Sequence, residues 1–141
     1  MKLGTVAPVG FDDFEPAEWL GCYRALGCEV VQAYRTQARE VSADEIRRAI
    51  GAGGMPCDSL HGVFGEEFDP SAPDETARRS AVEVYRREGR LCRELGGDLV
   101  VVHCSTIRRE GVGDEERAVR IAQVKRTIAE LGPYGAEIGV R

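Results

Sequence analysis

The stretch RELGGDLVVVHC, residues 93–104, contains the junction that decides the fold. An amphipathic helical pattern ends at Leu95, Gly96 follows, and the chain then enters the β-branched run 100–102. Glycine supplies the left-handed residue that often ends a helix, and a strand that is apolar at every position is typical of a parallel sheet. The junction therefore predicts a helix that leads directly into a buried parallel strand.

The same junction recurs outward from this stretch. It is found at residues 24–31 (RALGCEVV) and, in a looser form, at residues 129–140 (AELGPYGAEIGV). Strands are expected at 3–8, 29–34, 57–63, 99–104 and 137–140, and helices at 16–26, 43–52, 75–95 and 115–131. Strict alternation of strand and helix implies a parallel sheet with right-handed crossovers. Because no linker or low-complexity segment interrupts the pattern, we expect one domain over residues 1–141.

Composition narrows the class of protein. Hydrophobic residues make up 43% of the chain and charged residues 30%, as in an ordinary soluble domain. The net charge of −5 offers no basic surface to nucleic acid, and no apolar run approaches the roughly 20 residues of a membrane span. The N-terminal residues lack the apolar segment of a signal peptide, and five cysteines without a C-x-x-C pair disfavour a secreted disulfide framework. We therefore expect a cytoplasmic protein that binds neither membranes nor nucleic acid.

The two histidines of the chain mark the candidate site. His61 closes the third expected strand and His103 the fourth, while Tyr34 and Arg35 end the second. In parallel α/β folds the active site lies at this edge of the sheet. One such histidine would more simply be structural, but two at the same edge favour a site, since imidazole is a common metal ligand and acid/base group. We expect both rings in a common mouth, and Cys104, which alternates with His103, in the core.

The loops after the third and fourth strands leave alternatives open. The acidic loop 65–70 either covers a substrate or is a solvated surface loop. Arg108 and Arg109 either pair with a phosphate or carboxylate of a ligand or form a simple exposed pair. The glycine clusters 51–54 and 96–97 precede strands, whereas a phosphate-binding loop follows a strand and opens a helix, so these glycines are turns.

The strand ends Leu60-His61 and Val100-Val101-Val102-His103, with the helix–Leu-Gly–strand junctions, resemble the xylose isomerase-like TIM-barrel superfamily over the whole chain. The resemblance implies an α/β fold of parallel βα repeats that forms the N-terminal half of a TIM (β/α)8 barrel. It implies a metal-dependent sugar or sugar-phosphate isomerase or epimerase as the function. Since the sequence stops just inside the expected fifth strand, we expect the domain to be truncated there and inactive alone.

The resemblance also implies a divalent metal ion, Mn, Mg, Co or Zn, at the mouth of the intact barrel. In the endonuclease branch of the superfamily the residues that match His61 and His103 bind zinc, whereas in the epimerase branch they lie near the substrate. The predicted substrate-binding set is therefore His61, His103, Tyr34 and Arg35. The carboxylates that hold the epimerase metal belong to later strands, so this chain alone is expected to hold at most part of a metal site.

Two other functions stay open beside the isomerase or epimerase. One is a non-catalytic half-barrel, or an open flavodoxin-like α/β sheet, that binds a ligand or partner. The other is an apurinic endonuclease-like zinc hydrolase, which the negative charge disfavours. The expected partner is a sugar or sugar phosphate. Because a half-barrel has open edge strands, we also expect self-association or binding of a complementary half-barrel.

Overall fold

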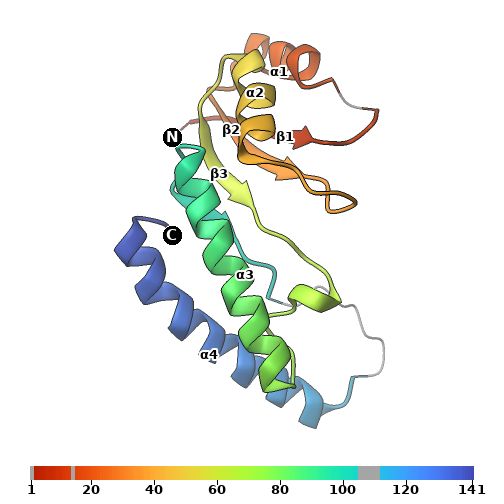
Figure 1. The fold of residues 1–141 in the computed structure, drawn as a ribbon, viewed down its shortest axis with the longest axis vertical. Helices are drawn as coiled ribbons and strands as arrows, with labels where there is room; N and C mark the ends of the chain where they lie inside the picture. Colours follow the sequence, from red (N-terminus) through yellow and green to blue (C-terminus); the bar gives the residue numbers. More distant parts are fainter. Residues whose placement is uncertain (1, 14, 105–111) are drawn as a thin grey trace.

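Strands and helices alternate in the computed structural model, which describes residues 2–13, 15–104 and 112–141 (Figure 1). The elements in chain order are β1 (Gly4–Val9), α1 (Pro16–Ala25), β2 (Val30–Arg35), α2 (Ala43–Gly53), β3 (Cys57–His61), the 3-10 turn η1 (Glu66–Phe68), α3 (Glu75–Glu94), β4 (Leu99–Val101) and α4 (Asp114–Ile138). The strands pair in parallel in the order β1-β2-β3-β4. This topology confirms the predicted parallel βα repeats.

The predicted turn and cap residues have the expected local geometry. Gly27 and Gly96 have φ angles of +93° and +92°, the left-handed region that a side chain would disfavour. Ser42 caps α2 by accepting a hydrogen bond from the amide of Glu45 at 3.2 Å. These residues set where each helix ends and where the next begins, so the helix–glycine–strand junction is confirmed at its first two copies.

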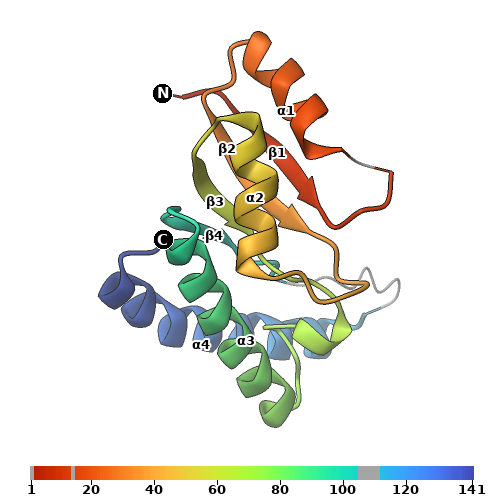
Figure 2. The ribbon, with the colours of Figure 1, turned by 45° about the horizontal axis from the view of Figure 1, so that its top comes forward.

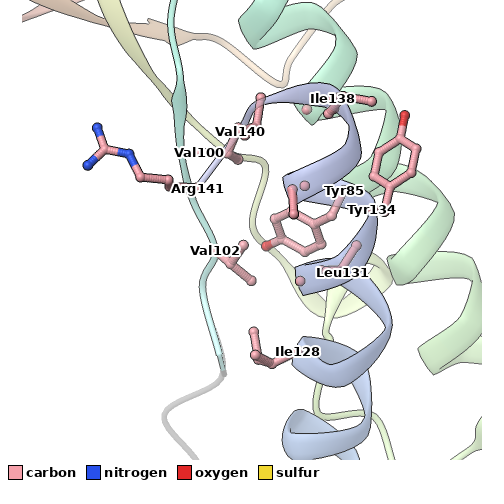
Figure 3. Close-up of a pocket in the computed structure, with 13 residues that line it drawn as sticks. Tyr85, Val100, Val102, Ile128, Leu131, Tyr134, Ile138, Val140 and Arg141 are labelled. Carbon is pink, nitrogen blue, oxygen red and sulfur yellow. The ribbon is translucent and has the colours of Figure 1, made fainter.

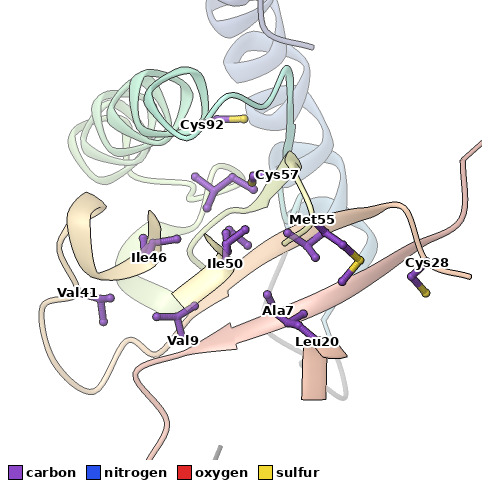
Figure 4. Close-up of a cluster of buried hydrophobic side chains, with 13 residues drawn as sticks. Ala7, Val9, Leu20, Cys28, Val41, Ile46, Ile50, Met55, Cys57 and Cys92 are labelled. Atoms are coloured by element: carbon purple, nitrogen blue, oxygen red, sulfur yellow. The ribbon is translucent and has the colours of Figure 1, made fainter. Parts of the chain in front are cut away.

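One face of the sheet packs against the helices (Figure 2). Ala7, Ala33 and Leu60 alternate with outward residues along their strands and are almost completely buried. They form one apolar cluster with Leu20 of α1 and Ile46 of α2 (Figure 4). Burying the side chains of Leu20, Ile46 and Leu60 contributes roughly 1.5–3 kcal/mol each. This cluster is the apolar core that positions the sheet.

The opposite face of the sheet is more open. Val6 is 42% exposed, and Gln32, Tyr34 and His61 are half-buried. These side chains alternate with the core residues along their strands. The helices pack on the other face, so these side chains stay partly accessible.

The C-terminal part of the chain differs from the prediction. Residues 137–140 were expected to start a fifth strand, but α4 continues to Ile138 through Pro133 and ends at Gly139, whose φ is +71°. The prediction that a helix ends at the third Leu-Gly pair, Leu131-Gly132, is therefore wrong, because this pair lies inside α4. Packing against α3 explains the difference: Tyr134 accepts a hydrogen bond from Arg90 at 2.8 Å, and tertiary packing overrides the local helix-ending signals.

A buried arginine joins α3 to α4. Arg78 is fully buried, and its guanidinium donates hydrogen bonds to Thr127 at 3.1 Å and Glu130 at 2.6 Å on α4. It also donates to Glu75 on its own helix at 2.9 and 3.0 Å. These carboxylates, Glu75 foremost, raise the pKa of Arg78, and the guanidinium groups of Arg78 and Arg79 lower the pKa of Glu75. The charge is buried only because its donors are paired.

A second polar link ties the loop after β3 to α4. Asp69 is buried and accepts hydrogen bonds from both the amide and the hydroxyl of Ser71, at 2.8 and 2.6 Å. Its other oxygen accepts from Arg120 on α4 at 2.8 Å. Asp69 of the loop 65–70 is thus a buried structural group. The loop is therefore not wholly solvated.

No helix in the described part of the chain is both long enough and apolar enough to cross a membrane.

Replacing Arg78 with alanine is expected to reduce the free energy of unfolding by about 1–3 kcal/mol, because the buried hydroxyl of Thr127 and the carboxylates of Glu75 and Glu130 lose a hydrogen-bond donor. Arg79→Ala is the matched control, since Arg79 contacts the same Glu75 but its side chain is 72% exposed. Arg79→Ala should reduce the free energy of unfolding by about 0.5 kcal/mol or less. Urea denaturation of the two variants measures both values. Equal losses would contradict the assignment of Arg78 as the link between α3 and α4.

Candidate functional site

The two histidines lie side by side at the C-terminal edge of the sheet. His61 is the last residue of β3, and His103 follows the end of β4 by two residues. Their ring centroids are 4.7 Å apart, with 45° between the ring planes. The prediction that the two imidazoles lie together at one edge of the sheet is therefore confirmed.

A close backbone approach brings these rings together. The amide of Gly62 donates to the carbonyl of Val101 at 3.1 Å, which extends the β3–β4 ladder beyond His61. A Cβ atom on Gly62 would lie 2.4 Å from that carbonyl oxygen and 3.0 Å from the ring of Tyr85. Position 62 therefore accepts glycine alone, because any side chain would separate the two strand ends.

Tyr85 of α3 holds both strand ends from the helix side. Its hydroxyl donates to the carbonyl of Val63 at 2.8 Å and accepts from the amide of His103 at 3.3 Å. Tyr85 is almost fully buried, and this burial raises its pKa to about 12, so the hydroxyl keeps its proton. A single neutral hydroxyl thus fixes the segments that follow β3 and β4.

Aromatic rings surround the imidazole pair. Tyr34 packs edge-on against His61 with centroids 4.8 Å apart, and Phe11 lies 5.3 Å beyond Tyr34. On the other side Phe64 lies 5.8 Å from His61 and 5.2 Å from His103. We call these five residues the imidazole–aromatic cluster. It combines two imidazole rings with three aromatic rings, a composition that suits a ligand with both hydroxyl and C–H groups.

Gln37 fixes Phe64 within this cluster. Its side-chain amide donates to the carbonyl of Phe64 at 2.9 Å and accepts from the amide of Phe64 at 2.8 Å. The two bonds imitate a strand pairing between the loops after β2 and β3. Gln37 therefore acts through Phe64 as a positioning residue.

A hydrogen bond sets the tautomer of His61, and burial lowers the pKa of His103. Nδ1 of His61 lies 3.1 Å from the carbonyl of Gly62, and since a carbonyl only accepts, Nδ1 carries the proton. In the neutral ring Nε2 of His61 is then free to accept a hydrogen bond. Nε2 of His103 is buried without a hydrogen-bond partner among the described residues. Burial lowers the pKa of His103, and the neighbouring His61 lowers it further, so His103 is held in its neutral form.

The other predicted residues lie elsewhere. Arg35 forms a 2.6 Å ion pair with Glu88 of α3, and both side chains are largely buried. The structure therefore does not bring Arg35 into the cluster, and its contact with a substrate stays a prediction. Cys104 was expected in the core but is exposed, because β4 ends at Val101 and strand alternation stops there. Arg108 and Arg109 lie outside the described residues.

Sequence reasoning missed Phe11 and Phe64. Each follows a strand end by two or three residues, after β1 and β3 respectively. Their positions in the sequence could have indicated them, because loops that follow parallel strands lie at the same edge of the sheet as the histidines.

A metal ion would find only part of its donors here. Nε2 of His61 and Nε2 of His103 are suitable imidazole donors, but a stable site needs at least three protein ligands. Residues 2–13, 15–104 and 112–141 contain no group of three or more His, Cys, Asp or Glu side chains able to hold a metal. The described residues therefore offer two imidazole nitrogens and no complete metal centre.

Comparison with known proteins gives consistent results at the level of fold. The family profile described as xylose isomerase-like TIM barrel matches residues 7–141. No curated protein matches the chain at a significant level.

Among solved structures, a D-psicose 3-epimerase solved in the presence of D-fructose is 14% identical with a TM-score of 0.75, covering 100% of this chain and 50% of its own. The D-psicose 3-epimerase of Clostridium cellulolyticum H10 with D-tagatose is 14% identical with a TM-score of 0.72, covering 99% and 50%. The 3-keto-D-glucoside 4-epimerase of E. coli is 18% identical with a TM-score of 0.68, covering 99% and 54%. The chain spans about half the length of these structures, and its parallel sheet with alternating helices matches half of a TIM barrel.

Gly62→Ala is expected to reduce the free energy of unfolding by about 1–3 kcal/mol, since the added methyl group would overlap the carbonyl of Val101. Gly21→Ala in α1 is the control, because a Cβ there meets nothing within 4 Å and alanine favours the helix. Urea denaturation should show a loss in the first variant and a gain in the second. A Gly62→Ala protein as stable as the control would show that the strand ends do not approach this closely.

The lowered pKa of His103 makes folding less favourable in acid. Below about pH 6.5 the unfolded chain binds a proton that the folded His103 resists, so stability rises with pH across this range. Wild-type protein should lose a few degrees more in Tm between pH 7.5 and 5.5 than His103→Gln. In His61→Gln, an NMR titration should give a higher pKa for His103, because one cause of the lowering is gone. An unchanged or lower value would contradict the coupling of the two rings.

Proposed function

The chain belongs to the xylose isomerase-like TIM barrel family, and on this premise we propose that it supplies the sugar-binding edge of an isomerase or epimerase barrel. The observation that carries the proposal is the pairing of His61 with His103 at the C-terminal edge of the sheet, enclosed by aromatic rings. This is the edge at which TIM barrels place their active sites.

A ketose fits the chemistry of the imidazole–aromatic cluster. Its hydroxyl groups would donate hydrogen bonds to the Nε2 atoms of His61 and His103. The buried Nε2 of His103 would then gain the partner that it lacks among the described residues. Its C–H groups would pack on the rings of Tyr34 and Phe64. The solved epimerases with the same fold were determined in the presence of D-fructose and with D-tagatose, which supports a ketose as the substrate class.

The described residues bind and orient but do not complete the chemistry. Isomerisation or epimerisation moves a proton beside a carbonyl, and a divalent metal ion of the family barrel would stabilise the oxyanion that develops. His61 and His103 provide two nitrogen donors and no third ligand lies with them in the described residues. We therefore propose that residues 1–141 are inactive by themselves and that the complete barrel is active.

A zinc hydrolase of the endonuclease type is the second candidate. It is supported by the same two Nε2 atoms, since neither has a described hydrogen-bond partner that would compete with a metal. The net charge of −5 disfavours a nucleic-acid substrate.

The cysteines support a cytoplasmic location as part of this proposal. All five are free thiols, and three of them, Cys28, Cys57 and Cys92, are buried. Burial raises the pKa of Cys92 to about 11, so this thiol is unreactive at neutral pH. Free thiols are typical of a reducing compartment.

The proposal predicts that D-fructose or D-tagatose perturbs the imidazole resonances of both histidines in NMR titrations, with a dissociation constant in the millimolar range. Tyr34→Ala should weaken this binding about tenfold, because it removes one stacking face. Phe11→Ala is the control and should weaken binding less than Tyr34→Ala, since the ring of Phe11 packs against Tyr34. Equal effects of all sugars and of glycerol on the two rings would count against a specific site.

The same samples decide between the candidate functions. With added Mn²⁺ the purified chain should show no measurable interconversion of ketose epimers. Metal-dependent interconversion that is lost in His103→Ala would overturn the proposed inactivity. Zinc binding through both rings without any response to ketoses would favour the hydrolase.

A further inference from the structure

One of the two ring nitrogens that the site offers to a ligand is covered. Nε2 of His103 is buried and has no hydrogen-bond partner among the described residues. A buried nitrogen of this kind lacks a bond that a ligand could supply. A small ligand reaches this nitrogen only when the group that covers it moves aside. The site therefore needs a moving part.

Two rings pack on His103 in the described part of the chain, those of His61 and Phe64. Their centroids lie 4.7 and 5.2 Å from the centroid of the His103 ring. His61 is fixed, because it belongs to β3 and its Nδ1 is hydrogen-bonded to the carbonyl of Gly62 at 3.1 Å. Phe64 lies in the loop after β3, so its ring is the cover that can move.

The helix side of the sheet offers no other route to this nitrogen. An apolar groove of about 430 Å³ lies there, between β4, α3 and α4 (Figure 3). Tyr85, Val100 and Val102 are among the described residues that line the groove, and neither histidine is one of them. Tyr85 is also hydrogen-bonded to the backbone that follows both strands, which closes this side.

Buried hydrogen bonds fix the loop on either side of Phe64. Before it, the carbonyl of Val63 accepts from the hydroxyl of Tyr85 at 2.8 Å. After it, Asp69 accepts from the amide and the hydroxyl of Ser71 at 2.8 and 2.6 Å. All three bonds are shielded from solvent, so the two ends of the loop stay in place.

The attachment of Phe64 itself is exposed to solvent. Its amide donates to the side-chain oxygen of Gln37 at 2.8 Å, and its carbonyl accepts from the side-chain nitrogen at 2.9 Å. Exposed hydrogen bonds of this kind open more readily than buried ones. Gly65 follows with a φ of +132°, and glycine adapts to other backbone angles without a side chain to clash. Phe64 can therefore move about Gly65 while Val63 and Asp69 remain fixed.

We propose that Phe64 is a gate over Nε2 of His103 and that Gln37 is its latch. In the closed state the two hydrogen bonds of Gln37 hold the ring against both imidazoles. When these bonds break, Phe64 moves away and Nε2 of His103 becomes accessible to a small ligand. The gate controls access to the nitrogen and does not depend on which ligand binds there.

Chemical modification of the imidazole at pH 7.5 tests the gate without a ligand. Diethyl pyrocarbonate acylates neutral imidazole nitrogens, and long-range proton–nitrogen NMR spectra show which nitrogen has reacted. Gln37→Ala removes the latch and keeps the ring, so acylation at Nε2 of His103 should become about tenfold faster, as expected when exposed hydrogen bonds are lost. Phe64→Ala removes the ring and should accelerate the reaction at least as much. Phe11→Ala is the matched control and should leave the rate unchanged, because the ring of Phe11 packs on Tyr34.

Hydrogen exchange measures the same opening independently. In the wild-type protein, exchange of the Phe64 amide should be slowed by the same factor as acylation of His103 is slowed relative to Phe64→Ala, within about threefold. If loss of the Phe64 ring destabilises the fold, Gln37→Ala decides alone, since it keeps every ring of the site.

Three results would overturn the proposal. Acylation of Nε2 of His103 in the wild-type protein as fast as in Phe64→Ala would show that Phe64 is not the cover. A wild-type rate in Gln37→Ala would show that Gln37 is not the latch. An equal acceleration in Phe11→Ala would show a general loosening of the site and no gate.

Discussion

The site depends on one close contact, the approach of Gly62 to the carbonyl of Val101. Their hydrogen bond adds a rung to the β3–β4 ladder at the point where each strand gives way to its loop. The absence of a side chain on Gly62 is what allows the distance. Because His61 precedes this glycine and His103 follows Val101 by two residues, the contact determines that the two imidazoles meet. Tyr85 then fixes both segments from the helix layer.

The arrangement of helices determines which face of the sheet can act. Apolar side chains such as Val31 and Leu60 are buried against the helices, whereas Tyr34 and His61 alternate with them and remain partly accessible. The polar links of Arg78 and Asp69 hold α4 and the loop after β3 in place behind this edge. The rigid part of the molecule thus lies on the helix side. The candidate site lies at the C-terminal ends of the strands, where parallel α/β folds place their active sites.

The prediction of the fold and of the histidine pair succeeded for a physical reason. Glycines at Gly27 and Gly96 end helices through backbone geometry, which is a local property that the sequence displays directly. The strand-end rule then places His61 and His103 at one edge without further information. The predicted end of the last helix was wrong, because distant contacts extend this helix. Tyr134 and Ile138 pack on α3, and no short pattern around Pro133 indicates that contact. The same limit applies to Arg35, since its ion pair with Glu88 spans 53 residues.

Two imidazoles from neighbouring strands lie together at one edge of the sheet. The most direct measurement is a two-dimensional NOE spectrum of the imidazole ring protons, assigned with His61→Gln, because the chain contains only two histidines. With ring centroids 4.7 Å apart, the account predicts a cross-peak between a ring proton of His61 and one of His103. Both rings giving cross-peaks to Phe64 but none to each other would contradict the direct pairing. Cross-peaks from each histidine to separate parts of the sheet would contradict the site as a whole.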